Sequence, residues 1–338
     1  MAPLATIRTT SDVTLRNHLD TFMHHANLHM EILNFSEVHH AGVAFETADQ
    51  GVSMSGKRGV TLRAQWLGKH LRELRESAGL TLKEAGEYLQ RDGSTVSRFE
   101  AGLYPARTPD VIALLDLYGV TALHEREGMI RLSRDVWQNG WWDDYSGDVS
   151  LGIVDYAWLE ARAEKISSFD AFVIPGLLQT RDYMEAVIRA EDADASDEQV
   201  SRWIEFRRTR QQILADDGPR FSAILDEYVL RRSIGGPEIM HGQLGQLAKY
   251  ASTPNVEIRV LPLTAGAHAS PDGAFRIFQL PQPYPAVAYV PTPAGSIYVE
   301  GEAANRLKLK YDRIRRDSLS AKDSLELIAA VAESLSDT

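Results

Sequence analysis

A short run of hydroxyl side chains ending in an arginine is the segment of this sequence best suited to reading nucleic acid. Serine, threonine and arginine form hydrogen bonds with base edges in the major groove of DNA. Val96 and Phe99 lie within the run at the spacing of one helical face. A helix that buries these two side chains turns the polar ones outward, and the pattern predicts a DNA-reading helix. The outward residues are Ser94, Thr95, Ser97 and Arg98.

Two predicted helices precede this run and must position it. The first covers about 66–78, with apolar residues on one face, and Gly79 ends it. The second begins with a Thr81–Glu84 capping box. Gly86 lies where the second helix must approach the third, and we expect a side chain larger than alanine to hold them apart. Such close packing favours a helix-turn-helix over a simple helical bundle.

The predicted third helix is capped by Asp92 or Ser94 and ends at Ala101–Gly102. A fourth helix follows, with Thr108 as its cap and Pro109 at its first position. A fifth covers about 121–137. Gln90 and Arg91 form the tight turn between the second and third helices.

Residues 67–118 resemble the Cro and phage-repressor type of helix-turn-helix, the XRE family. The segments 71–75, 78–81 and 94–102 carry the resemblance. It implies a mainly α, lambda-repressor-like five-helix domain that binds a double-stranded DNA operator through the third helix. The base or phosphate contacts that it implies are Asp92, Gly93, Ser94, Thr95, Ser97 and Arg98. We expect Lys83, Arg91 and Arg107 to contact phosphates.

The same resemblance implies a buried ion pair between Arg75 and Glu100, which we interpret as structural. In one respect this sequence departs from the family pattern. The turn between the second and third helices usually contains glycine, but Gln90 is found there.

The rest of the chain resembles the C-terminal domain of antitoxin-like XRE regulators of actinobacteria. The segments that carry this resemblance are 141–145, 156–163, 173–183, 206–210 and 225–232. That domain has no assigned chemistry, and its relatives are often encoded beside a small partner protein. The resemblance implies control by that partner or by a ligand. An antitoxin-like module that neutralises a partner, with DNA binding as autoregulation, is the alternative.

The pattern of residues 139–338 predicts an α+β domain for sensing or partner binding. Strand, helix and strand over 221–261 indicate a parallel βαβ unit, and three later strand-like runs indicate an antiparallel meander. The predicted helices cover 153–167, 180–190, 197–215, 237–251 and 303–336, and the predicted strands cover 221–225, 256–261, 275–280, 286–290 and 296–299.

Composition supports a cytoplasmic regulator without a membrane span. The chain has 338 residues, a net charge of −11 and no cysteine. Residues 57–110 carry a net charge of +3, which leaves −14 on the remainder. This charge pattern suits a mildly basic DNA-binding head, covering 61–138, joined to an acidic body that does not contact the phosphates. We expect it to act as a homodimer.

Two groups of residues outside the head are candidates for a ligand or partner surface. Trp141, Trp142 and Tyr145 belong to an aromatic cluster, for which core packing at the domain junction is the favoured alternative. Pro175, Gly176 and Gln179 could form a ligand loop, or simply a turn before a helix cap at Thr180. No catalytic signature stands out, and we expect neither an enzyme nor a cofactor nor a metal site.

The sequence of residues 1–60 predicts a poorly ordered extension, and Met54 is a candidate for the native start of the protein. Gly51, Gly56 and Lys57 match most of a phosphate-loop pattern, but Arg58 replaces the magnesium-binding hydroxyl. His25 and His29 have metal-ligand spacing without the glutamate of a zinc protease. Neither pattern is adopted as a site.

Overall fold

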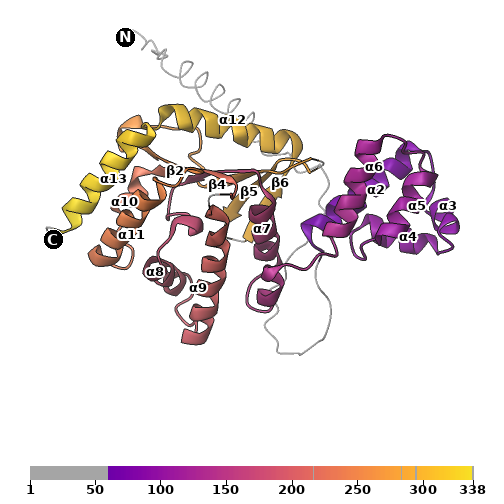
Figure 1. The fold of residues 1–338 in the computed structure, drawn as a ribbon, viewed down its shortest axis with the longest axis horizontal. Coiled ribbons are helices and arrows are strands. Elements are labelled where there is room, and N and C mark those ends of the chain that lie inside the picture. Colours follow the sequence, from indigo (N-terminus) through magenta and orange to yellow (C-terminus); the bar gives the residue numbers. More distant parts are fainter. Residues whose placement is uncertain (1–59, 216, 283, 294, 337–338) are drawn as a thin grey trace, which may run out of the picture. The chain divides into compact units, whose positions relative to one another are not determined.

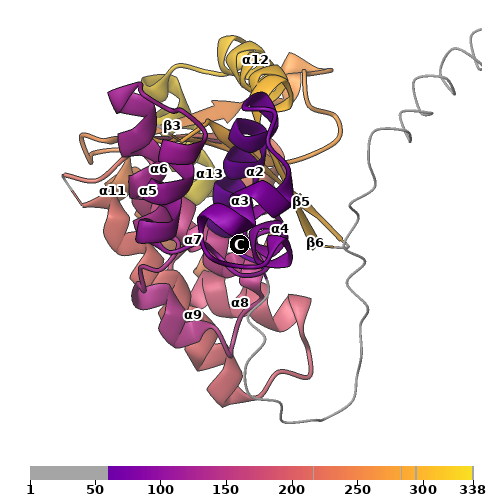
Figure 2. The same ribbon diagram turned by 90° about the vertical axis from the view of Figure 1, so that its right-hand side faces the viewer.

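In the computed structural model, residues 60–138 are a set of helices packed on one another through buried apolar side chains. The structure describes residues 60–336 except 216, 283 and 294, so our predictions for residues 1–59, including those at Met54, Lys57 and the histidines, lie outside the described residues. Five helices form the head (Figures 1 and 2), namely α2 (Leu62–Ser77), α3 (Leu82–Tyr88), α4 (Gly93–Glu100), α5 (Thr108–Leu117) and α6 (Leu123–Asp135). They match the five predicted helices in order.

Local caps set most of the helix boundaries of the head. The Thr81–Glu84 capping box is present, and Asp92 caps α4 by accepting a hydrogen bond from the Ser94 backbone. The prediction for α5 was wrong by one position. Arg107 is its N-cap residue, and the Thr108 hydroxyl instead pairs with Ser133 at 3.0 Å.

Glycines allow the backbones of three helices to approach closely. A Cβ on Gly86 would meet the backbone of Gly93 at 2.7 Å, and one on Gly68 would meet the Glu100 carbonyl oxygen at 2.4 Å. Even alanine is therefore too large at Gly86, so the constraint there is tighter than the sequence suggested. Gln90, where the family has glycine, adopts a left-handed φ of 55°. Its position agrees with the expected turn.

The C-terminal half is an α+β domain built on a six-stranded mixed sheet in the order β3-β2-β1-β4-β5-β6. The strands β1, β2 and β3 are parallel, whereas β4, β5 and β6 form an antiparallel meander beside β1. Both predicted sheet motifs are confirmed. The strands are β1 (Lys165–Asp170), β2 (Arg220–Asp226), β3 (Val256–Leu261), β4 (Phe275–Gln279), β5 (Val287–Thr292) and β6 (Gly295–Val299).

The two faces of this sheet carry separate apolar clusters. On one face, α12 (Gly301–Asp317) packs Ala304, Tyr311 and Ile314 against strand residues such as Phe169 and Ile277. The other helices cover the opposite face (Figure 1). They are α7 (Leu151–Arg162), α8 (Arg181–Glu191), α9 (Asp197–Gln211), α10 (Glu227–Arg231), α11 (Pro237–Tyr250) and α13 (Ala321–Ser336). Short 3₁₀ turns are η1 (Trp141–Tyr145), η2 (Gly176–Leu178), η3 (Gln212–Leu214) and η4 (Leu263–Ala265), of which η4 packs Ala265 on the α12 side.

Two predictions for the C-terminal half were wrong. The helix expected over 153–167 ends at Arg162, and the strand β1 follows it. The single C-terminal helix is two helices, because the Leu319 backbone N–H leaves the helical pattern and bonds Val260 of β3 at 2.9 Å.

Head and body meet through buried polar groups within the compact unit Arg58–Thr338. Asp135 of α6 accepts hydrogen bonds from Arg162 of α7, at 2.7 Å, and from the Tyr284 hydroxyl. Asp155 of α7 accepts one from the Leu62 backbone N–H at 2.8 Å, and its second carboxylate oxygen is buried with no hydrogen-bond partner among the described residues. An acidic residue of the body thus fixes the first turn of α2.

We predict that Glu100→Ala destabilises the head. The Arg75 guanidinium bonds both Glu100 oxygens, at 2.6 and 2.9 Å, and both side chains are largely buried. Removing the carboxylate leaves a buried cation unpaired, which should lower the free energy of unfolding by about 3–5 kcal/mol. Urea unfolding measures this value. The control is Glu76→Ala, which removes an exposed carboxylate near Arg75 on α2. Equal losses of unfolding free energy in the two variants would contradict a special role for the Arg75–Glu100 pair.

We predict that Asp155 makes the protein less stable as pH rises. Burial raises the pKa of Asp155 to about 6, from its ordinary value of 3.8. The folded state therefore holds a proton that the unfolded state has released, and stability falls as pH rises through the folded pKa. Between pH 5 and pH 8 this cost grows by about 1–2 kcal/mol. Asp155→Asn should lose that part of the pH dependence in urea unfolding, and parallel profiles for the two proteins would contradict the prediction.

Candidate nucleic-acid interface

The outer face of α4 is polar and accessible, as the sequence predicted. Val96 and Phe99 are buried at 0% and 1% exposure, whereas Ser94, Ser97 and Arg98 are exposed. Thr95 is only half-buried and contributes less to this face than expected. The helix therefore presents two hydroxyls and a guanidinium on the side away from the core.

Arg98 is available for a new partner. In the described part of the chain, its guanidinium lies within ion-pairing distance of no carboxylate, in contrast to Arg75 and Arg91. A guanidinium can bond the two acceptors of a guanine edge with two parallel hydrogen bonds. Because it loses no internal ion pair on binding, Arg98 is the best candidate for base recognition.

Asp92 and Gly93 form the start of α4. The Asp92 carboxylate accepts a hydrogen bond from the Ser94 backbone at 2.7 Å, and this bond lowers the pKa of Asp92. A carboxylate that stays charged repels phosphate but can accept a bond from a cytosine amino group. A Cβ on Gly93 would come within 3.0 Å of the Leu82 carbonyl oxygen. Gly93 thus serves the α3–α4 packing.

The three predicted phosphate contacts differ in their surroundings. Lys83 is exposed, with Glu87 at 3.8 Å. Arg91 is committed to Asp110 at 3.0 Å, which weakens the case for a phosphate contact. The Arg107 guanidinium lies over the Trp137 ring, 4.4 Å from its centroid. Stacking of this kind orients a guanidinium while its N–H groups remain free to bind phosphate.

An aromatic strip beside α4 was missed by the sequence analysis. The Tyr104 ring stacks on Phe99 at 6.0 Å and meets Trp137 edge-on at 6.4 Å. Tyr104 and Trp137 are 48% and 40% exposed. The only sequence signal was a pair of large apolar residues, Leu103 and Tyr104, directly after the closing Gly102.

The other candidate surface residues lie mostly inside the body. Trp142 and Tyr145 are buried, and Trp141 packs on Phe206 at 5.5 Å. Pro175 and Gln179 are buried as well, and the Gln179 amide donates to the Ile174 carbonyl oxygen at 2.7 Å. Only Trp141 and Gly176 are partly accessible. Core packing, the favoured alternative for the aromatic cluster, describes its environment better than a binding surface does.

Among the described residues, no helix is long and apolar enough to cross a membrane. No group of three or more histidine, aspartate or glutamate side chains that could hold a metal ion was found in the same part of the chain.

Comparison with known proteins identifies both halves of the chain. Residues 66–128 match a family model described as a helix-turn-helix domain, and residues 153–330 match one described as a domain of unknown function, DUF5753. No curated protein and no solved structure matches the chain. The helix-turn-helix match supports a DNA-binding regulator and covers α3 and α4 with the exposed face described above. Since the second match spans more than half of the sequence, the chain belongs to the DUF5753 family.

Proposed function

We propose that this protein is a sequence-specific transcriptional regulator of the XRE type that binds a DNA operator through α4. The observation that carries the proposal is the exposed Ser94, Ser97 and Arg98 face on a helix fixed by buried Val96 and Phe99. Two hydroxyls and a guanidinium supply hydrogen-bond donors for the acceptors of the major groove. The proposal assigns no catalytic reaction to the chain and places its action in the cytoplasm.

A homodimer is part of the proposal. One short recognition helix offers few base contacts, and related readers reach useful affinity by placing two such helices about 34 Å apart on a two-fold symmetric site. The body carries most of the net charge of −11. Its repulsion from phosphate keeps non-specific binding weak, so that discrimination depends on a few side chains such as Arg98.

We also propose that the body controls the head, through a ligand or a small partner protein. Support comes from exposed apolar residues that follow the parallel strands. Phe172 follows β1 and Leu263 follows β3, and they are 61% and 56% exposed. β1 and β3 both run parallel to β2, which lies between them, so their carboxyl ends are at the same end of the sheet. Exposed apolar groups at that end of the sheet support a partner-binding surface there.

Arg98→Ala should weaken operator binding and relax the base preference. Loss of one bidentate base contact should cost about 1–3 kcal/mol of discrimination between base pairs. The phosphate contacts carry no sequence information and remain, so non-specific binding should persist. Footprinting and mobility shift on operator and mutated operator measure the two effects. Arg306→Ala, which removes an exposed arginine from α12, is the matched control. An unchanged base preference in Arg98→Ala would count against α4 as the reading helix.

The partner alternative is tested with the product of the neighbouring gene. If the chain acts chiefly as an antitoxin-like module, that product should bind the purified protein and lose its own activity. If the chain is chiefly a regulator, the product should change the mobility shift of the operator. A complex that alters neither DNA binding nor the partner's activity would contradict control by this route.

A further inference from the structure

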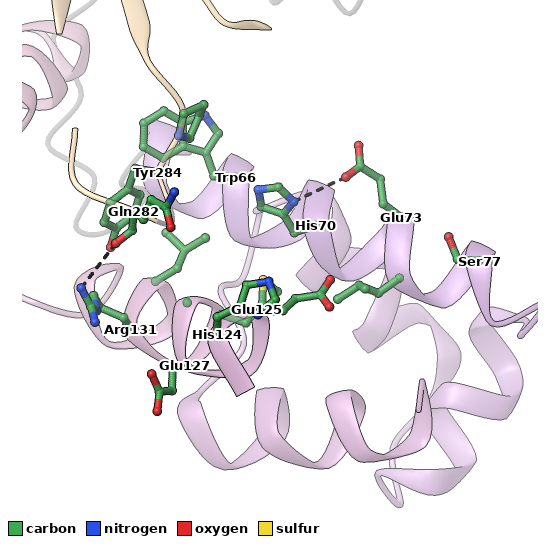
Figure 3. A pocket seen from close by; sticks show the side chains of 15 residues that line it. Trp66, His70, Glu73, Ser77, His124, Glu125, Glu127, Arg131, Gln282 and Tyr284 are labelled. Atoms are coloured by element: carbon green, nitrogen blue, oxygen red, sulfur yellow. Dashed lines mark hydrogen bonds and ion pairs between the residues drawn. The ribbon is translucent and has the colours of Figure 1, made fainter. Parts of the chain in front are cut away.

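A groove lies between α2, α6 and the segment that joins β4 to β5 (Figure 3). Its volume is about 780 Å³, within the range of pockets that hold small molecules. Its lining comes from two helices of the head and from the body. The residues that matter below are Trp66, His70, Glu73, Leu74, His124, Glu125, Glu127, Met129, Arg131, Leu132, Gln282 and Tyr284.

The floor of the groove is apolar and aromatic. The Trp66 and Tyr284 ring centroids lie 6.0 Å apart, and Met129 and Leu132, which are also buried, line the same groove. The polar atoms of both rings are already used, since the Trp66 N–H bonds Glu300 and the Tyr284 hydroxyl bonds Asp135. Both side chains are more than nine-tenths buried, so they offer an occupant only a small apolar part of their rings.

The rim of the groove is negatively charged. In the described part of the chain, Glu125 and Glu127 have no cationic side chain within ion-pairing distance, and Glu73 has only the His70 imidazole, at 3.4 Å. Figure 3 shows Glu125 in the gap between α6 and α2, whereas Glu127 points away from α2. The one arginine of the rim, Arg131, donates to the Gln282 carbonyl oxygen at 3.4 Å.

We infer that this groove binds a small organic cation, an amine or quaternary ammonium attached to an apolar body. The Glu73 and Glu125 carboxylates on the rim attract a cation and repel an anion, and the apolar floor suits the body of an organic ligand. The apolar body of such a ligand would cover the floor formed by Trp66, Leu74 and Met129. Its size is limited by the groove volume.

An occupant of this groove touches the elements that hold the reading helix. α2, which forms one wall, packs Gly68 on the backbone of Glu100 and pairs Arg75 with the Glu100 carboxylate. The opposite side includes Tyr284 of the body, bonded to Asp135 of α6. A ligand that favours one arrangement of these three elements must change DNA affinity by the same factor by which DNA changes ligand affinity. The inference that the groove is an effector site rests on the proposed function.

Calorimetry on the full chain without DNA tests the ligand class directly. We expect benzyltrimethylammonium to bind with saturation, and phenylacetate, an anion with the same ring, to bind at least about tenfold more weakly. Glu125→Gln should weaken cation binding by about threefold, the size of an exposed ion-pair interaction. The control is Glu326→Gln, which changes an exposed carboxylate of α13 that does not line the groove. This variant should bind the cation as the parent does.

The outcomes separate the two proposals. If the cation does not bind, if phenylacetate binds equally, or if Glu125→Gln binds as the parent does, the ligand inference is overturned. A mobility shift with and without benzyltrimethylammonium then tests the effector role. A cation that binds but leaves operator affinity unchanged overturns that role alone. Absence of any operator binding overturns the proposed function, and the calorimetric result is unaffected by it.

Discussion

The close approach of α2 to α4 is the constraint on which the head depends. At Gly68 the two backbones lie so near that a Cβ would overlap the carbonyl oxygens of Phe99 and Glu100, and the Arg75–Glu100 pair fastens the helices again two turns further along. Because close-packed elements shift as bodies rather than deform smoothly, α4 moves only if α2 moves. The polar face of α4 is therefore as well fixed as α2 itself.

The fixing of α2 depends in turn on the body. Its first turn bonds Asp155 of α7, and the Arg63 guanidinium, on that same turn, bonds the Asp135 carbonyl oxygen at 3.0 Å. Asp135 also receives Arg162 and Tyr284 from the body. These groups are buried, and a buried charge that loses its partner is costly. A rearrangement of this junction therefore costs little only if each of these buried charges keeps a partner.

Elements set by neighbours in sequence were predictable, and those set by distant partners were not. The Thr81–Glu84 box, the Gly86 approach and the antiparallel meander follow from local patterns. β1 was missed because it is covered on both faces, so Ser167, Ser168 and Asp170 are buried and no alternation is visible. The outward residues of α4 were predictable from Val96 and Phe99 alone. The groove was not, because its lining joins residues 66–132 to residues 282–285.

The interior of the body argues that any control acts at its periphery. Arg210 bonds both oxygens of the buried Glu160, and Arg276 bonds the buried Asp170. Both guanidinium groups lie close to the Tyr156 ring. Separating either pair would leave a buried charge unpaired, at a cost of several kcal/mol. A ligand that changes equilibrium affinity by 5–150-fold supplies only about 1–3 kcal/mol. Such a ligand cannot rearrange the centre of the sheet, but it can shift a junction whose alternatives are close in free energy.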